Sequence, residues 1–332
     1  MMNLHLVRRI DNKLMRIDAY VLCTFATMSD KKLRILFFGT PDFAATSLIA
    51  MVKKGFDVVG VVTAVDKPAG RGQKIQESAV KTVALSLGLP VFQPTNLKSD
   101  GFYQSMCDLR IDLGVVIAFR MLPERIWSLP RLGTINLHGS LLPQYRGAAP
   151  IHHAVINGES KTGVTTFFLK HEIDTGDIIS SDTLLIGEDE TVGELHDRMM
   201  IVGAELMVNT LELIENDKQS SMPQIYDSTL KMAPKLNRAF CKLDLGMDLQ
   251  SFHNKVRGLS PVPCAWIETQ FGDMKIYRGM KHDVKIPSLE KVFIHNKKLW
   301  IDLIDGTYEI LELQLPGKPK MASQDFLNGL KK

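Results

Sequence analysis

Short apolar runs alternate with helix-like patterns between residues 33 and 215, and this alternation constrains the fold more than any other feature. The first run ends at Gly39, and a helical pattern over residues 43–53 follows it. Strands that alternate with helices indicate a mostly parallel, doubly wound α/β sheet. In such sheets ligands bind beyond the carboxyl ends of the strands. We therefore expect five strands, at residues 33–38, 58–63, 113–118, 134–138 and 163–169.

A different pattern follows this region. Thr191 and Glu194 form a capping box at the start of an amphipathic helix, and residues 215–234 then turn polar, which predicts a linker. Beyond the linker, short strands with turns at residues 272–273 and 305–306 indicate a small β-barrel of the oligonucleotide-binding type. The expected strands are residues 264–271, 274–278, 292–295, 299–304 and 308–315.

The composition is that of a globular protein large enough for two domains, with 332 residues, 45% of them apolar and 23% charged. No apolar run approaches the roughly 18 residues that span a bilayer. The four cysteines contain no Cys-x-x-Cys pair, which favours idle thiols in a reducing compartment. We therefore expect the cytoplasm as the location.

Residues 1–27 loosely resemble a signal or transit peptide, because basic residues precede a short apolar run. Asp11 and Asp18 interrupt the basic part, and no small-residue cleavage site follows. We expect Met28 to be the physiological start and residues 1–27 to be a non-native or disordered extension.

Cofactor motifs are incomplete in this chain. The turn at residues 39–44 has only the first glycine of a dinucleotide-binding pattern, which disfavours a nicotinamide cofactor. No strand is expected to lead directly into the glycines of residues 67–74, so we expect a flexible basic loop there. His152 and His153 have no Cys or Glu at ligand spacing, so no metal site is expected.

Positive charge gathers in the second half of the chain. Residues 233–332 contain 16 Lys and Arg against 11 Asp and Glu, a local charge of +5. This excess fits either a solvated basic surface or a domain that favours a polyanion.

The segment most informative about chemistry is Ile-Asn-Leu-His-Gly-Ser-Leu-Leu-Pro at residues 135–143. Asn136 and His138 are two residues apart at the end of an expected strand, so their side chains leave on the same face. In acyl transfer an amide can donate to the developing oxyanion while an imidazole moves protons. The same pair could also be structural, and spacing alone does not decide.

A second candidate, Asp174, follows the fifth expected strand in the run Asp-Thr-Gly-Asp. A carboxylate near an imidazole favours the charged imidazolium and fixes its orientation. Asp and Gly are also common turn formers, so a polar turn is the alternative.

Residues 136–143 together with residues 174–177 resemble the core of the folate-dependent formyltransferases. Within that group, the chain from about residue 33 to residue 329 is similar to the members that act on methionyl-tRNA. Further matching stretches are residues 38–44, 67–72, 89–94, 146–150 and 317–321. The resemblance implies formyl transfer from 10-formyltetrahydrofolate to the α-amine of initiator methionyl-tRNA, without a metal.

The resemblance also implies roles for individual residues. Asn136, His138 and Asp174 would be the catalytic trio, and the folate pocket would be lined by Ser140, Leu141, Leu142 and Pro143. The basic loop would contact tRNA through Lys67, Arg71 and Lys74. Arg120 departs from the family pattern, which commonly has Gly there, so residues 117–121 are assigned no folate contacts.

The implied architecture is a formyltransferase domain over residues 28–215, a linker over 216–236 and a tRNA-binding barrel over 237–332, acting as a monomer. Three rivals stay open. Glycinamide ribonucleotide transformylase lacks such a barrel, and an enzyme that formylates an amino-sugar nucleotide gives no reason for the basic loop. A catalytically idle nucleic-acid-binding module would not need the trio.

Overall fold

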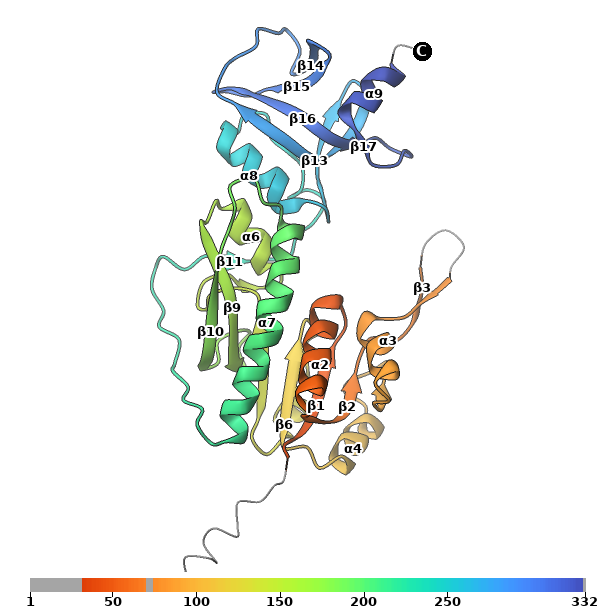
Figure 1. Ribbon diagram of the computed structural model, residues 1–332, viewed down its shortest axis with the longest axis vertical. Coiled ribbons are helices and arrows are strands. Elements are labelled where there is room, and N and C mark those ends of the chain that lie inside the picture. The colour runs from red at the N-terminus through yellow and green to blue at the C-terminus, as the bar shows by residue number, and fades with distance from the viewer. Residues whose placement is uncertain (1–31, 70–73, 331–332) are drawn as a thin grey trace, which may run out of the picture. The chain divides into compact units, whose positions relative to one another are not determined.

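The computed structural model describes residues 32–69 and 74–330 and begins with a seven-stranded sheet (Figure 1). The strand order is β10-β9-β7-β6-β1-β2-β5. Neighbours among β1, β2, β5, β6 and β7 run parallel, whereas β9 and β10 are antiparallel. The strands are β1 (Arg34–Gly39), β2 (Asp57–Val62), β5 (Val91–Phe92), β6 (Leu113–Ile117), β7 (Thr134–His138), β9 (Lys161–Phe168) and β10 (Ile178–Leu185). The mostly parallel, doubly wound sheet is therefore confirmed.

Two of these strands were not predicted from the sequence. β5 has only two residues, too few to show a period. β10 is an edge strand with polar residues at its centre, Ser-Ser-Asp-Thr, and it lacks the apolar run of a buried strand.

Helices cover both faces of the sheet, because successive side chains of a strand point to opposite faces. In β1, Leu36 and Phe38 pack in one cluster with Phe102 of α4 and Ile126 of α5. α2 and α7 lie side by side on a sheet face in Figure 1 and contact each other. The helices of this half are α2 (Asp42–Lys54), α3 (Ala79–Ser86), α4 (Asp100–Asp108), α5 (Glu124–Trp127), α6 (Pro150–Ile156) and α7 (Val192–Glu215).

The predicted capping box at the start of α7 is present. The Thr191 side chain accepts from the Glu194 backbone N–H, and the Glu194 carboxylate accepts from the Thr191 backbone N–H. A Cβ added to Gly203 would lie 3.0 Å from Leu137 of β7, so α7 approaches the sheet closely there. Since Leu137 faces α7, the alternating residues Asn136 and His138 face the other way.

The polar segment after α7 forms backbone hydrogen bonds with segments of the domain that contains the seven-stranded sheet. Met222 forms an antiparallel bridge with Ile178, and β11 (Met232–Ala233) pairs in parallel with β8 (Arg146–Gly147). Composition predicted a linker here; its backbone also bonds to segments next to the sheet.

The second half is an antiparallel sheet in the order β12-β13-β16-β15-β14, with β17 paired to β16. Among the described strands β12 and β14 do not pair with each other, so the sheet forms a half-barrel and the expected barrel is open. Its elements are β12 (Ala265–Thr269), β13 (Gly272–His282), β14 (Val292–His295), β15 (Lys298–Asp302), β16 (Thr307–Gln314), β17 (Met321–Ala322), α8 (Leu249–Leu259) and α9 (Ser323–Gly329).

The five predicted strands are present, but one turn is misplaced. The chain turns at Gln270 and Phe271, and Gly272, with φ of +99°, is already the first residue of β13. The turn at residues 305–306 is confirmed. None of the helices in the described part of the chain combines the length and apolar character that crossing a membrane requires.

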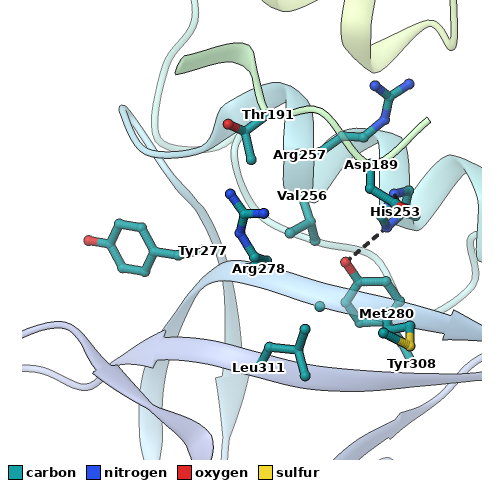
Figure 2. A pocket seen from close by; sticks show the side chains of 11 residues that line it. Asp189, Thr191, His253, Val256, Arg257, Tyr277, Arg278, Met280, Tyr308 and Leu311 are labelled. Carbon is teal, nitrogen blue, oxygen red and sulfur yellow. Dashed lines mark hydrogen bonds and ion pairs between the residues drawn. The ribbon is translucent and has the colours of Figure 1, made fainter. Parts of the chain in front are cut away.

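A cavity of about 200 Å³ lies where α8, β13 and β16 meet the segment before α7 (Figure 2). His253 of α8 is 2% exposed, and its Nδ1 shares a hydrogen bond of 3.2 Å with the Tyr308 hydroxyl. Its Nε2 lies 3.1 Å from Asp189 Oδ1, close enough for an ion pair but not aligned as a hydrogen bond. Burial lowers the pKa of His253, Lys281 and Arg257 act in the same direction, and Asp189 opposes them.

His253 should therefore make folding depend on pH. Because its pKa is lowered in the folded state, the unfolded chain binds the proton first as the pH falls through about 6.5. The free energy of unfolding therefore has its highest value above that pH and decreases as the pH falls below it. We expect His253→Gln to lose less stability than the wild type between about pH 7.5 and pH 5.5, measured by urea unfolding. An equal loss in both proteins would contradict this role.

Candidate active site

Asn136 and His138 lie at the carboxyl end of β7, as predicted. Asn136 pairs with Val116 of β6 and Phe167 of β9, and His138 pairs with Thr165. Asn136 is half-buried, and no hydrogen bond to its side chain occurs within residues 32–69 and 74–330. Its amide is therefore available to donate to a ligand on that face of the sheet.

The imidazole of His138 is buried and held in one orientation. Its Nε2 lies 2.9 Å from the Tyr145 carbonyl oxygen. A carbonyl oxygen can only accept, so Nε2 carries the proton of this bond. The ring also meets the Phe167 ring edge to face, with centroids 6.5 Å apart. These contacts direct Nδ1 toward Asp174, whose Oδ2 is 3.8 Å away.

Asp174 follows β9, and its backbone is in the left-handed region with φ of +55°. Its Oδ2 accepts a hydrogen bond of 2.9 Å from the backbone N–H of Gly147. The side chains of His138 and Asp174 are 7% and 11% exposed, so little water screens a charge on either. The distance between them suits an ion pair with a protonated ring and is too long for a hydrogen bond.

The segment at residues 140–143 follows β7 directly and is bonded to β9. Ser140 is fully buried, and its hydroxyl donates to the Gln144 carbonyl oxygen at 2.6 Å. Thr165 of β9 donates to the Ser140 carbonyl at 2.7 Å and accepts from the Leu142 N–H at 3.2 Å. The Ser140 hydroxyl thus has its partner within the loop, and half-buried Leu141 and Pro143 are the more accessible residues of the segment.

Arg120, which we expected to depart from the family pattern, contacts a neighbouring loop. Its guanidinium donates to the carbonyl oxygen of Pro94 and lies 5.7 Å from the centroid of the Phe119 ring. The larger side chain is thus accommodated by contacts with its surroundings.

The basic segment contains a hairpin, which corrects the expectation that no strand leads into it. β3 (Lys67–Ala69) pairs with β4 (Lys74–Gln76) in antiparallel register. Strands of three residues that include a proline show no alternation, so the sequence did not reveal them. Lys67 is exposed, Lys74 is described by its backbone alone, and Arg71 lies outside the described residues.

Sequence reasoning assigned no role to Tyr145, which contacts the trio through its backbone. Tyr145 supplies the carbonyl that binds His138, and its hydroxyl donates to Glu159 Oε1 at 2.5 Å. Lys231 also contacts Glu159, at 2.7 Å. Burial raises the pKa of Tyr145, and although burial opposes it, Lys231 and Tyr145 hold the pKa of Glu159 below its usual value.

Arg146 and Gln224 were also assigned no role. Both are buried, and the guanidinium of Arg146 donates to the side-chain oxygen of Gln224. The only available signal was the matching stretch at residues 146–150, which contains Arg146; Gln224 stands in a polar segment with no pattern.

Comparisons with known proteins identify both halves of the chain. The profile of the family described as formyl transferase matches residues 31–211, and that described as formyl transferase, C-terminal domain, matches residues 235–331. The chain is 47% identical to a methionyl-tRNA formyltransferase of Parabacteroides distasonis, over 92% of this chain and 98% of the relative. It is also 47% identical to one of Flavobacterium psychrophilum, over 90% and 97%.

Solved structures with the same fold are more distant in sequence. HypX from Aquifex aeolicus in complex with tetrahydrofolic acid matches with a TM-score of 0.63 at 17% identity, over 91% of this chain and 48% of HypX. This chain thus spans about half of HypX. An N-formyltransferase from Helicobacter canadensis in complex with folinic acid and dTDP-3-aminofucose matches with a TM-score of 0.62 at 19% identity, over 84% and 98%. At these identities the match shows the fold alone, whereas the relatives at 47% and the two family profiles show that the chain belongs to the methionyl-tRNA formyltransferases of the formyl transferase family.

Proposed function

We propose that the protein transfers the formyl group of 10-formyltetrahydrofolate to the α-amine of initiator methionyl-tRNA, as a monomer in the cytoplasm. The observation that carries this proposal is the arrangement of Asn136, His138 and Asp174 at the carboxyl end of β7. It occurs in a chain whose relatives, similar along almost their whole length, are methionyl-tRNA formyltransferases.

The reaction begins when the α-amine attacks the formyl carbon. A C–N bond forms, and the formyl oxygen becomes an oxyanion. The Asn136 amide, which has no partner within the described residues, donates to that oxygen. Collapse of the intermediate breaks the bond between the formyl carbon and N10 of the folate, and tetrahydrofolate leaves.

The attacking nitrogen loses one proton and N10 gains one, and His138 serves both transfers. Since Nε2 is held by the Tyr145 carbonyl, Nδ1 is the nitrogen left to carry the transferred proton. Asp174 stabilises the imidazolium from 3.8 Å in a site with little solvent. Each group then acts on charge that develops during the reaction.

The folate would bind against residues 140–143. The hydrogen bonds of Ser140 and Thr165 fix the shape of this loop beside His138. Leu141 and Pro143 offer apolar surface to the pterin, while Ser140 and Leu142 act through the backbone they hold in place.

We assign catalysis to residues 28–215, the connection to 216–236 and tRNA binding to 237–332, together with the basic hairpin. Lys67, Arg71 and Lys74 would meet phosphates of the acceptor arm, and residues 233–332 add a local charge of +5.

Lys67 is the described residue of the hairpin that tests this contact. Lys67→Ala should raise KM for methionyl-tRNA and leave KM for the folate unchanged, because only the acceptor would meet the hairpin. The loss of one phosphate contact should also make the negative slope of log(kcat/KM) against log(salt) less steep by about one. Lys53→Ala, at an exposed position of α2, is a matched control. Wild-type salt dependence in the Lys67→Ala variant would contradict the proposed contact between Lys67 and the tRNA.

The donor and the product can be tested together. The protein is incubated with methionyl-tRNA and 10-formyltetrahydrofolate that carries a labelled formyl carbon. After the aminoacyl ester is hydrolysed, the label should appear in N-formylmethionine, with an equal amount of tetrahydrofolate released. Retention of the label on the folate would contradict the proposal.

A further inference from the structure

The buried side chain of Gln224 lies in the polar segment after α7, where composition predicts exposed residues. It is only 6% exposed, although glutamine is mostly found at the surface. A buried amide must satisfy its donors and acceptors within the protein, so its partners show what the residue does.

All hydrogen-bonding positions of the Gln224 amide are used. Its Nε2 donates to the carbonyl oxygens of Asp174, at 2.9 Å, and of Gly176, at 2.7 Å. Its Oε1 accepts from Nε of Arg146, at 3.0 Å, and from Nη2 of the same side chain. The carbonyls can only accept and the guanidinium can only donate, so the orientation of the amide is determined by its partners.

These bonds join the two backbone segments that hold the Asp174 carboxylate. One is the turn at residues 174–176, which bears the carboxylate, and the other is β8, whose Gly147 N–H binds it at 2.9 Å. The backbone of Asp174 is left-handed, a conformation that neighbouring contacts must maintain in a residue other than glycine. The two bonds from Nε2 supply such contacts on either side of Thr175.

Arg146 explains why the segment carries this particular side chain. It is 5% exposed, and no ion pair with a carboxylate is formed within the described part of the chain. Its guanidinium donates to Oε1 of Gln224 and lies over the Tyr226 ring, 4.2 Å from the ring centroid, and both contacts stabilise its charge. Residues 224–226 therefore contact both the buried guanidinium of Arg146 and the backbone of the turn at Asp174.

We propose that Gln224 is a positioning residue, which holds the turn at Asp174 so that the carboxylate faces His138. This rests on the proposed function, in which Asp174 stabilises the imidazolium. The connection between the two halves is then a structural part of the active site.

Gln224→Glu separates the two sides of the amide. The new carboxylate keeps the volume and can still accept from Arg146, but it cannot donate to the carbonyls of Asp174 and Gly176. We expect kcat to fall about 10-fold to 100-fold through misplacement of the carboxylate, with little change in KM for either substrate. Ile225→Ala is the matched control, because Ile225 is the next residue and its side chain is 82% exposed.

A double-mutant cycle with Asp174→Asn distinguishes positioning from general destabilisation. If Gln224 acts through Asp174, Gln224→Glu should lower kcat much less in the Asp174→Asn background than in the wild type. Gln224→Met, which is uncharged and of similar length, replaces Gln224→Glu if that variant does not fold. Wild-type kcat in a folded variant, or effects that multiply fully, would overturn the inference. An active Asp174→Asn single variant would instead overturn the proposed role of the trio.

Discussion

His138→Ala and Asn136→Ala should each lower kcat by about 100-fold to 1,000-fold. Asn136 would lose a donor to the oxyanion, and His138 would lose the group that carries protons between the attacking and leaving nitrogens. Both contacts strengthen in the transition state, so the KM values should change much less than kcat. Single-turnover transfer at saturating folate and methionyl-tRNA measures the step directly.

Folding must be compared in the same proteins. The Asn136 side chain makes no hydrogen bond within the described residues, so its removal leaves no buried partner unsatisfied. Asn209→Ala, on the exposed face of α7, applies the same substitution away from the site. Wild-type turnover in either active-site variant would reject the catalytic assignment.

Asp174→Asn is expected to have an effect of similar size, because it removes charge and preserves shape. The attraction between unit charges 3.8 Å apart is about 4 kcal/mol at an effective dielectric constant of 20. Part of this attraction offsets the cost of burying the carboxylate, so we expect turnover to fall about 100-fold.

The amide oxygen of the variant can still accept from the Gly147 N–H, so the turn should persist. Asp177→Asn is the matched control: it is the same substitution three residues away, on a side chain that pairs with Lys170. Wild-type turnover in the Asp174→Asn variant would mean that Asp174 serves only as a turn residue.

Periodicity predicted what local sequence determines. The run at residues 134–138 predicted β7 with its bounds, and the two-residue spacing placed Asn136 and His138 on one face. The capping box at Thr191 was also predictable from the sequence, because all its partners lie within one turn of helix. Asp174 was a candidate from its place after the fifth expected strand, but only the resemblance gave it a catalytic role, since it lies 36 positions after His138 and no local pattern links them.

Contacts between distant segments could not be predicted in this way. The bonds from Gln224 to Asp174 span 50 residues, and those to Arg146 span 78. Polar composition indicated a linker, since polar residues favour solvent. The same residues can also satisfy buried polar groups once the fold brings distant segments together, and composition does not distinguish the two cases. The turn at Gln270 and Phe271 was misplaced for a related reason: Gly272 marks a positive φ, which here begins a strand.

The most direct test of the proposed function is the choice of acceptor at saturating 10-formyltetrahydrofolate. The values of kcat/KM are measured for methionyl-tRNA, free methionine and a dTDP-linked amino sugar with the same preparation. Because phosphate contacts would contribute much of the binding, methionyl-tRNA should exceed both small amines by about 100-fold or more. A value for the amino-sugar nucleotide equal to or above that for methionyl-tRNA would contradict the assignment.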